Sequence, residues 1–334
     1  MRLKFLTVPL TAGIMALSLT PEMIMRIMLG RNESGQRIRE RGMAKLENRK
    51  KDPKDIMYPA AVCSASKQAE NEAFKAEHPE ETISVISYDG LRLAGFVRRR
   101  KDSRRWLIAF HGYRADHTEI TRLHFAREFF NMGYNVLAPD QRACGESEGN
   151  LIGMGWLERY DVMTWVTYIT EKDPEAEIVL FGDSMGASTV LAAAGLYQPP
   201  QVKAIIADSG YASVEAMAAK TAVNMLHLPA KPAIALCDIA SKRLAGFRLT
   251  EADISKELER TKVPVLIFHG KEDSIVPYSN FEVLSKVQTH SILEAVSFEK
   301  CDHVCGSLTE PERYWQTVRI FLEKAFVSTS ADQK

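Results

Sequence analysis

Short runs of apolar and β-branched residues recur along the chain from about residue 82 onward, and each has the length of a buried strand. Stretches with helical patterns separate these runs, and strands that alternate with helices predict a mainly parallel, doubly wound α/β sheet with helices on both faces. The first two runs alternate between apolar and polar residues around Asp89-Gly90, a pair favoured in two-residue hairpin turns. The expected strands are residues 82–88, 91–98, 106–110, 134–138, 178–181, 202–207, 263–268 and 292–298.

Residues 1–29 form a hydrophobic N-terminal segment of a different kind. Arg2 and Lys4 precede an apolar run over residues 5–19, which is shorter than the ~20 residues of a spanning helix but long enough for a signal-peptide core. The run resumes after Pro21 around Arg26. We interpret the segment as a signal or membrane anchor, so that export or membrane association is favoured over a cytoplasmic location. A helix packed on the main domain is the alternative.

The rest of the chain divides by composition into four further parts. Residues 30–81 are rich in charge and predict a helical extension, and residues 82–328 contain the expected sheet. Within that domain, a segment from about residue 211 to residue 258 interrupts the alternation of strands and helices and predicts a helical cap over the sheet edge. Residues 329–334 are a polar tail. The cap carries large apolar residues, most of which we expect to be buried between its helices: Met217, Met225, Leu226, Leu228, Ile234, Leu236, Leu244 and Phe247.

Charge and cysteine content narrow the classes of function. The chain has 43 basic and 43 acidic residues, so there is no net field to attract nucleic acid, and we predict no nucleic-acid partner. Its five cysteines do not indicate a disulfide scaffold. Cys301 and Cys305 bracket His303, but a metal cluster normally needs a second pair of ligands, so we predict no metal and no cofactor.

Ser184 lies in the sequence Gly182-Asp183-Ser184-Met185-Gly186, between an expected strand and an apolar helix at residues 187–196. A serine at such a tight strand-to-helix turn has its hydroxyl pushed outward, and the two glycines leave room for the turn. The helix that follows directs its free N–H groups and positive dipole end at the serine. The pattern favours a nucleophile, although a plain βα turn in another doubly wound sheet would look similar.

A base and an acid for this serine follow two later strands. Asp273 comes just after the strand at 263–268, and His303 lies in the loop beyond the strand at 292–298. The carboxyl ends of parallel strands lie at one edge of a sheet, where α/β proteins build their sites. We therefore predict Ser184 as nucleophile, His303 as general base and Asp273 as the acid that orients it. Asp302 stays as an alternative acid.

Two main-chain N–H groups are candidates for binding the oxyanion. Tyr113 follows Gly112 directly after the strand at 106–110, and Met185 follows the nucleophile. A glycine beside the site lets the chain turn so that the next N–H faces the substrate oxygen. We predict Tyr113 and Met185 as the donors. The side chain of His111 is expected to brace this loop by hydrogen bonding and not to react.

These segments together resemble the α/β-hydrolase superfamily, in its serine esterase/acyl-hydrolase branch. The likeness is carried by "FHGY" (110–113), "PDQRACGESEG" (139–149), "GDSMG" (182–186), "HGKEDSIVP" (269–277) and "DH" (302–303), in family order. The resemblance implies an α/β-hydrolase fold and assigns the same roles to Ser184, Asp273 and His303. The family often has Gly-His or His-Gly where this chain has Ala143-Cys144, which affects the expected substrate preference.

The expected activity is hydrolysis of a carboxylic ester or related acyl bond through an acyl-enzyme intermediate, with a small-molecule acyl or ester substrate. The apolar cap favours a hydrophobic substrate over a charged one. A peptidase, a thioesterase or an acyltransferase would keep the same triad and change only the pocket. A non-catalytic binding protein of this fold is a further alternative, although such proteins normally lack one of the three side chains.

Overall fold

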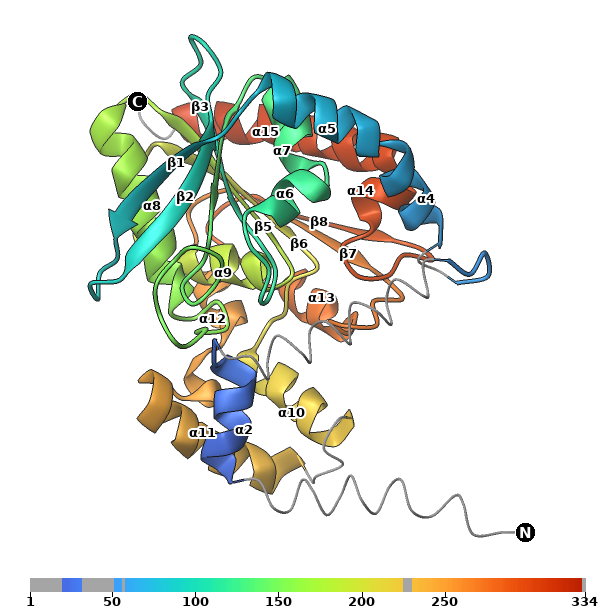
Figure 1. Cartoon of the computed structure of the whole chain (residues 1–334). Coiled ribbons are helices and arrows are strands. Elements are labelled where there is room, and N and C mark those ends of the chain that lie inside the picture. Colours follow the sequence, from blue (N-terminus) through green and yellow to red (C-terminus); the bar gives the residue numbers. More distant parts are fainter. Residues whose placement is uncertain (1–19, 32–50, 56–57, 225–229, 332–334) are drawn as a thin grey trace.

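One eight-stranded sheet forms the centre of the molecule, in the order β1-β2-β4-β3-β5-β6-β7-β8 (Figure 1). The computed structural model describes residues 20–31, 51–55, 58–224 and 230–331. Strands β1 and β2 pair antiparallel, β2 pairs antiparallel with β4, and all other pairs are parallel, which confirms the mainly parallel α/β sheet. The strands are β1 (Glu81–Ile86), β2 (Arg92–Arg98), β3 (Arg105–Phe110), β4 (Asn135–Pro139), β5 (Glu177–Asp183), β6 (Val202–Asp208), β7 (Val265–Gly270) and β8 (Leu293–Phe298).

The hairpin between β1 and β2 turns one residue earlier than the sequence indicated. The Gly90 N–H donates to the Ser87 carbonyl at 3.0 Å, so the central residues of the turn are Tyr88 and Asp89. Gly90 follows with a positive φ of 90°. This is the arrangement of a three-residue loop that ends in a glycine bulge, and it needs the glycine one place after the turn.

Alternate residues of the central strands face two separate cores. In β3, Trp106, Ile108 and Phe110 belong to one apolar cluster, and Leu107 and Ala109 belong to the other. This period of two is what a strand buried on both faces requires. The first cluster is covered by α8 (Glu158–Lys172) and α9 (Met185–Ala193), and the second by α7 (Phe125–Asn131) and α15 (Pro311–Ala331). Helix α15 includes residues 329–331 of the predicted polar tail.

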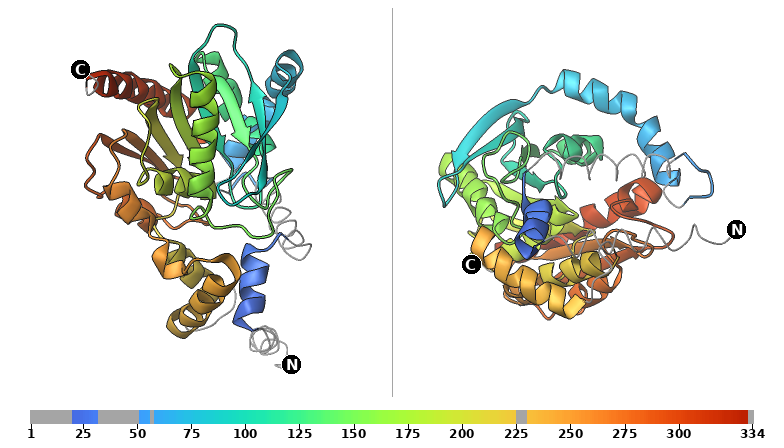
Figure 2. Two further views of the ribbon diagram at one scale, coloured as in Figure 1. Left: turned by 90° about the vertical axis from the view of Figure 1, so that its left-hand side faces the viewer. Right: turned by 60° about the horizontal axis from the view of Figure 1, so that its bottom comes forward.

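The predicted cap region contains helices that lie beyond the carboxyl ends of the strands (Figures 1 and 2). These are α10 (Val214–Asn224), α11 (Ala230–Ala245), the short 3₁₀ helix η1 (Leu249–Glu251) and α12 (Ile254–Glu259). Ile234 and Phe247 are buried, whereas Leu236 is 54% exposed. Met225, Leu226 and Leu228 lie outside the described residues.

Helix α2 (Pro21–Leu29) packs beside α11 in the described part of the N-terminal segment (Figure 2). The Thr20 hydroxyl accepts from the Met23 N–H and caps the helix, and Met25 and Leu29 are fully buried. A helix packed on the main domain is the alternative that the sequence left open for this segment. Residues 1–19 of the segment lie outside the described residues. None of the helices described here combines the length and apolarity that crossing a bilayer requires.

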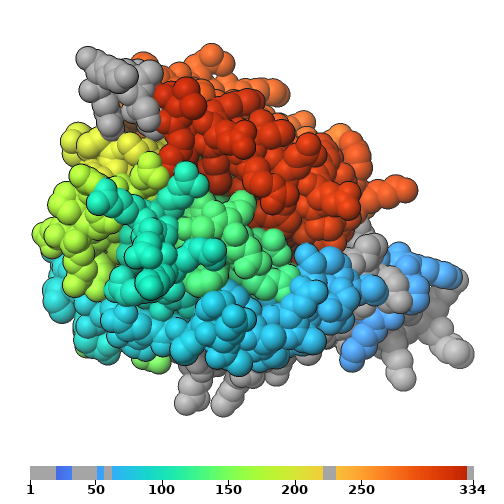
Figure 3. All heavy atoms as spheres, turned by 90° about the horizontal axis from the view of Figure 1, so that it is seen from above, coloured from blue at the N-terminus to red at the C-terminus, as the bar shows by residue number. Residues whose placement is uncertain are grey.

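Two further N-terminal helices, α4 (Tyr58–Ser66) and α5 (Gln68–Glu77), lie within the predicted extension of residues 30–81. Helix α5 contacts α6 (Thr118–Arg122), and α4 contacts α14 (Gly306–Thr309). Seen from above, the surface of α4 and α5 runs along one side of the molecule and that of α15 along the other (Figure 3). Helix α13 (Ser279–Leu284) follows β7 and completes the domain.

Candidate active site

Ser184 occupies a sharp turn between β5, which ends at Asp183, and α9, which begins at Met185. Its backbone has φ 55° and ψ −118°, a conformation that costs a non-glycine residue about 1–3 kcal/mol. A side chain at Gly182 would overlap the Gly186 carbonyl, and one at Gly186 would overlap the Phe110 carbonyl. Both glycines are thus needed for the turn to lie this close to β3 and α9.

The structure brings the three predicted side chains of the triad together at the carboxyl ends of β5, β7 and β8. His303 Nε2 lies 2.8 Å from Ser184 Oγ, and His303 Nδ1 lies 2.7 Å from Asp273 Oδ2. The Asp273 carboxylate is buried, and the His303 side chain is 12% exposed. This chain of contacts lets the imidazole accept the serine proton at Nε2 while Nδ1–H donates to the carboxylate.

Asp273 is held in place by groups on two sides. Its Oδ1 accepts from the main-chain N–H groups of Ile275 at 2.8 Å and Val276 at 2.7 Å. His269 Nε2 lies 3.4 Å from Asp273 Oδ2 and 3.0 Å from the Val276 carbonyl, so its Nε2 bears the proton. The sequence analysis gave no role to His269, although the residue ends its strand four positions before Asp273.

Asp302, the alternative acid, has a different position. Its Oδ1 accepts from the main-chain N–H groups of Ser274 and His303, both at 2.8 Å, and it contacts the Ser274 hydroxyl. These bonds join the loop after β7 to the loop after β8. The side chain of Asp273, not that of Asp302, contacts His303 Nδ1.

The acids around His303 determine its basicity. Burial by itself lowers the pKa of His303, but the charge and hydrogen bond of Asp273, with the charges of Asp208 and Asp302, outweigh burial and raise the pKa above its ordinary value of 6.5. Asp208 ends β6 and was also missed by sequence analysis. Its burial raises its own pKa to about 6. Tyr314 and Ser209 donate hydrogen bonds to its carboxylate.

The predicted oxyanion donors lie on the two segments next to Ser184. Met185 is the first residue of α9, where N–H groups have no partner within the helix. Tyr113 follows Gly112, whose own N–H already donates to Glu119 Oε1 at 2.8 Å. His111 is fully buried, with Nε2 accepting from the Gln141 N–H at 3.0 Å and Nδ1 2.8 Å from the Gly112 carbonyl. The ring therefore braces this loop through both nitrogens.

A pair of carboxyl groups, Asp183 and Glu119, lies beneath the turn. Burial and the neighbouring charge of Glu119 raise the pKa of Asp183 well above its ordinary value. Burial acts on Glu119 in the same direction, but Arg122, His111 and the bonds from Gly112 and Asp183 lower its pKa. The opposite directions of the two pKa shifts favour the proton of the pair on Asp183.

Helix α2 and the cap both reach the site's loops. The Tyr113 hydroxyl donates to the Met28 carbonyl, and Arg114 donates to the carbonyls of Ile27 and, at 3.2 Å, Gly30. From α10, Lys220 donates to the Ser274 carbonyl at 3.1 Å, next to Asp273. The N-terminal helix is thus part of the structure that positions the predicted oxyanion loop.

The described ranges contain no cluster of three His, Cys, Asp or Glu side chains that is arranged to hold a metal ion. Cys301 and Cys305, which flank His303, are both buried, and the structure joins neither of them in a disulfide. Cys305 Sγ lies 3.1 Å from the His303 carbonyl. These thiols pack behind the histidine loop and do not form part of the triad.

Comparison with known proteins agrees with this fold. Residues 101–239 match the family model described as "Serine aminopeptidase, S33". The uncharacterized protein YqkD of Bacillus subtilis is 27% identical over 76% of this chain and 83% of its own length. Esterase Pf2001 of Pyrococcus furiosus superposes with a TM-score of 0.59 at 22% identity, over 75% of this chain and 94% of its own. A bacterial membrane phospholipase A superposes with a TM-score of 0.53 at 18% identity, over 80% of this chain and 93% of its own. Together these likenesses show that the chain has an α/β-hydrolase fold.

Proposed function

We propose that this protein is a serine hydrolase that cleaves a carboxylic ester, or a related acyl bond, through an acyl-enzyme intermediate. The observation that carries the proposal is the continuous contact from Ser184 Oγ through His303 to Asp273, at 2.8 and 2.7 Å. A nucleophile, a base within hydrogen-bond reach and a third group that orients the base form the arrangement used in nucleophilic acyl transfer.

In the proposed mechanism, His303 takes the proton from Ser184 as the hydroxyl attacks the substrate carbonyl. Asp273 fixes the tautomer of the imidazole and stabilises its charged form. The N–H groups of Tyr113 and Met185 bind the oxyanion, and such a donor typically lowers the barrier by about 2.7–4 kcal/mol. His303 then gives its proton to the leaving alcohol, and a water activated by the same ring releases the acid.

The choice of an ester is supported by two features outside the triad. The predicted cap is rich in apolar residues and its helices lie beyond the carboxyl ends of the strands, and two solved structures with this fold are an esterase and a membrane phospholipase A. A peptidase is the second candidate, because the matching family model is described as a serine aminopeptidase. Rates on p-nitrophenyl esters of increasing chain length, compared with aminoacyl p-nitroanilides, separate the two.

A fluorophosphonate probe tests the proposed nucleophile directly. We expect the probe to label the full-length protein and to leave the Ser184→Ala variant unlabelled, because only an activated serine attacks it. The Ser188→Ala variant is the matched control, since Ser188 follows on α9 but hydrogen-bonds to the main chain of Tyr211. Labelling of the Ser184→Ala variant, or absence of label on the folded wild type, would contradict the assignment.

The rate is expected to depend on pH through His303, which must be neutral to accept a proton. Because the surrounding acids raise its pKa, the acidic limb of kcat/KM is expected to have its midpoint above 6.5. In Asp273→Asn the largest raising charge is gone and burial dominates, so the midpoint should move to lower pH. The measurement is kcat/KM between about pH 5 and 9, and a midpoint unmoved or moved upward by the substitution would refute this reading of His303.

A further inference from the structure

Asp208, at the end of β6, carries a buried carboxylate that has no cation against it. The residue is 2% exposed, and among the residues that the structure describes no lysine or arginine pairs with it. Asp161 is equally buried, but its carboxylate accepts two hydrogen bonds of 2.7 Å from the Arg142 guanidinium. Burying a charge without an opposite charge costs free energy, and groups of this kind gather at functional sites.

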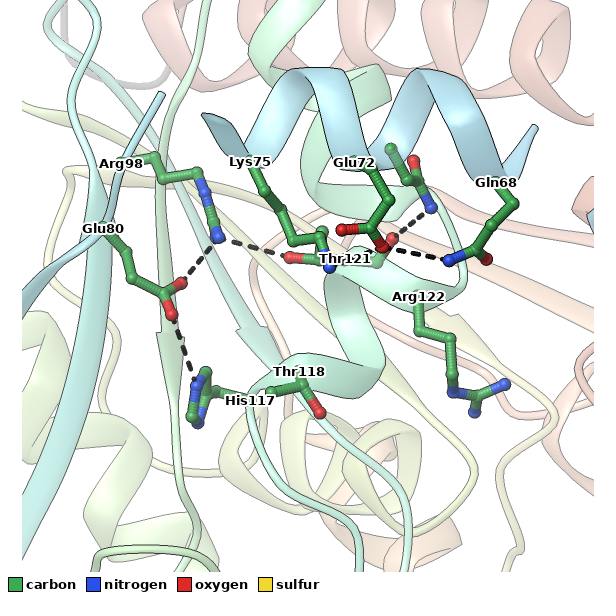
Figure 4. A pocket seen from close by; sticks show the side chains of 10 residues that line it. Gln68, Glu72, Lys75, Glu80, Arg98, His117, Thr118, Thr121 and Arg122 are labelled. Carbon is green, nitrogen blue, oxygen red and sulfur yellow. Dashed lines mark hydrogen bonds and ion pairs between the residues drawn. The ribbon is translucent and has the colours of Figure 1, made fainter. Parts of the chain in front are cut away.

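The polar cavity between α5 and α6 shows the more usual arrangement of charge (Figure 4). There Glu80 contacts both Arg98, at 2.7 Å, and His117, at 3.5 Å, so that the carboxylate and the cations of the wall neutralise one another. Asp208 has no such balance, and its surroundings must hold the carboxylate in another way.

Two hydroxyl groups hold the Asp208 carboxylate in place of a cation. The Tyr314 hydroxyl, on α15, donates to Oδ2 at 3.0 Å, and the Ser209 hydroxyl donates to Oδ1 at 2.9 Å. Tyr314 is fully buried, and its ring stacks on that of Phe268 in β7 with the ring centroids 4.1 Å apart. Both carboxylate oxygens therefore have a donor, one of them on a side chain that is itself packed in place.

The Ser209 hydroxyl extends this constraint to the loop of the base. Because it gives its own proton to Asp208, its oxygen is left to accept, and it accepts from the Val304 N–H at 3.1 Å. Val304 directly follows His303 and has φ 51°, a left-handed conformation that is strained for a β-branched residue. Strain of this kind persists only where surrounding contacts impose it, and the bond to Ser209 is one such contact.

Asp208 also contacts the nucleophile turn, through its main chain. Its carbonyl accepts from the Ser184 N–H at 2.8 Å, and the Ser209 N–H donates to the Phe268 carbonyl at 2.9 Å. Asp208 and Ser209 are thus bonded to the turn of Ser184 on one side and to the residue after His303 on the other. Their placement bears directly on the 2.8 Å between Ser184 Oγ and His303 Nε2.

We propose that Tyr314, Asp208 and Ser209 form a positioning relay that holds the loop of His303 against the nucleophile turn. All three residues are buried, so they act through the imidazole and not on the substrate. The carboxylate of the relay also acts on the ring by its charge, because Asp208 is one of the acids that raise the pKa of His303 above 6.5. The inference deepens the proposed function and rests on it wherever the readout is ester hydrolysis.

Hydrolysis of a p-nitrophenyl ester by the full-length protein tests the relay in the reaction. Ser209→Ala removes the acceptor of the loop N–H, and we expect kcat to fall about 10–100-fold while KM changes less than about twofold. Ser307→Ala is the matched control, because Ser307 is a buried serine just after His303 whose hydroxyl has no hydrogen-bond partner among the described residues. Its kcat should stay within about twofold of the wild type. If Ser209→Ala does not fold, Tyr314→Phe, which removes the other hydroxyl donor, takes its place with the same expected direction.

Hydrogen exchange needs no substrate and reports on the histidine loop directly. Mass spectrometry of peptides that cover residues 300–308 is expected to show faster amide exchange in Ser209→Ala than in the wild type, since the Val304 N–H has lost its acceptor. Exchange of the same peptides in Ser307→Ala should match the wild type.

The pKa of His303, followed by NMR in a pH titration, separates the relay from a purely structural role. Asp208→Asn keeps an oxygen for the Ser209 hydroxyl and has an amide N–H that can donate to the Tyr314 oxygen, so the bonds are retained and one charge is lost. Removing a negative charge that favours the imidazolium should lower the pKa of His303. The His303 signal is the one missing from the spectrum of His303→Gln. The other titratable groups that face Asp208 are unchanged in this variant: Asp183, Asp273, Cys305 and Tyr314.

Three results would count against the relay. Equal exchange in Ser209→Ala and the wild type would show that the bond does not hold the loop, and an unchanged pKa of His303 in Asp208→Asn would show that the carboxylate does not act on the ring; either overturns the proposal. So does an unchanged kcat in Ser209→Ala on an ester that the wild type hydrolyses. A folded wild type that hydrolyses no ester and takes no fluorophosphonate label would contradict the proposed function instead, and hydrogen exchange and NMR would then decide on the relay alone.

Discussion

Replacing Ser184 with alanine is expected to lower kcat on an ester substrate by roughly 10⁴–10⁶-fold while leaving the fold unchanged. Loss of the nucleophile in a serine hydrolase removes the acyl-enzyme route, and what is left comes from oxyanion binding and substrate positioning. Alanine fits the turn no worse than serine, since both have the same Cβ at φ 55°. The measurement is steady-state hydrolysis of a p-nitrophenyl ester, with thermal unfolding as the check on folding.

The other members of the triad sharpen this prediction. His303→Ala should cost about as much as Ser184→Ala, and the double variant little more, because the two side chains act as one unit. Asp273→Asn should lower kcat by roughly 10⁴-fold, since the amide favours the wrong tautomer. Asp302→Asn is the control for Asp273→Asn, because Asp302 is next to His303 in sequence but its carboxylate contacts main-chain N–H groups and the Ser274 hydroxyl. A larger loss in Asp302→Asn than in Asp273→Asn would reverse the assignment of the acid.

The sheet could be predicted because its strands are buried on both faces. Runs such as that of β5, which is almost wholly apolar, are hard to mistake for surface structure, and the eight expected runs correspond to the eight strands. The positions of Ser184, Asp273 and His303, each just after one of three parallel strands, allowed the site to be predicted as well. Parallel strands end at one edge, so side chains distant in sequence are placed together by topology alone.

The supporting side chains could not be predicted in this way. Glu119 reaches Gly112 and Asp183 from α6, and Asp208 reaches the surroundings of His303 from β6. Each contact depends on the rotation of one element against another, which periodicity does not determine. His269 is different, since its position four residues before Asp273 at a strand end was visible in the sequence.

The N-terminal segment shows how composition and packing differ. A high apolar content around residues 21–29 suggested a signal or an anchor, yet α2 is amphipathic. Met25 and Leu29, one helical turn apart, are fully buried, whereas Met23 is 46% exposed. A packed helix was the alternative left open by the sequence, but the sequence did not identify α11 and the loop at Tyr113 as the surface that α2 covers.

Removing α2 is therefore expected to destabilise the domain by about 3–6 kcal/mol, since full burial of each of two apolar side chains contributes about 1.5–3 kcal/mol. A chain that begins at Asn32 loses Met25 and Leu29 from the core and leaves Arg114 without its acceptors on Ile27 and Gly30. A chain that begins at Thr20 keeps the helix and its N-cap. Urea unfolding of the two chains measures the difference.

Single substitutions on α2 separate packing from chain length. Met25→Ala should lower the free energy of unfolding by about 2–5 kcal/mol, as for other large-to-small changes at fully buried sites. Met23→Ala, on the exposed side of the same helix, should change the free energy of unfolding by less than about 0.5 kcal/mol.

If α2 also positions the oxyanion loop, the chain that begins at Asn32 should have a lower kcat even at temperatures where it stays folded. Equal stability of the two truncated chains, or equal effects of Met25→Ala and Met23→Ala, would show that α2 is not part of the folded core. In that case the membrane or signal interpretation would extend to the whole of residues 1–29.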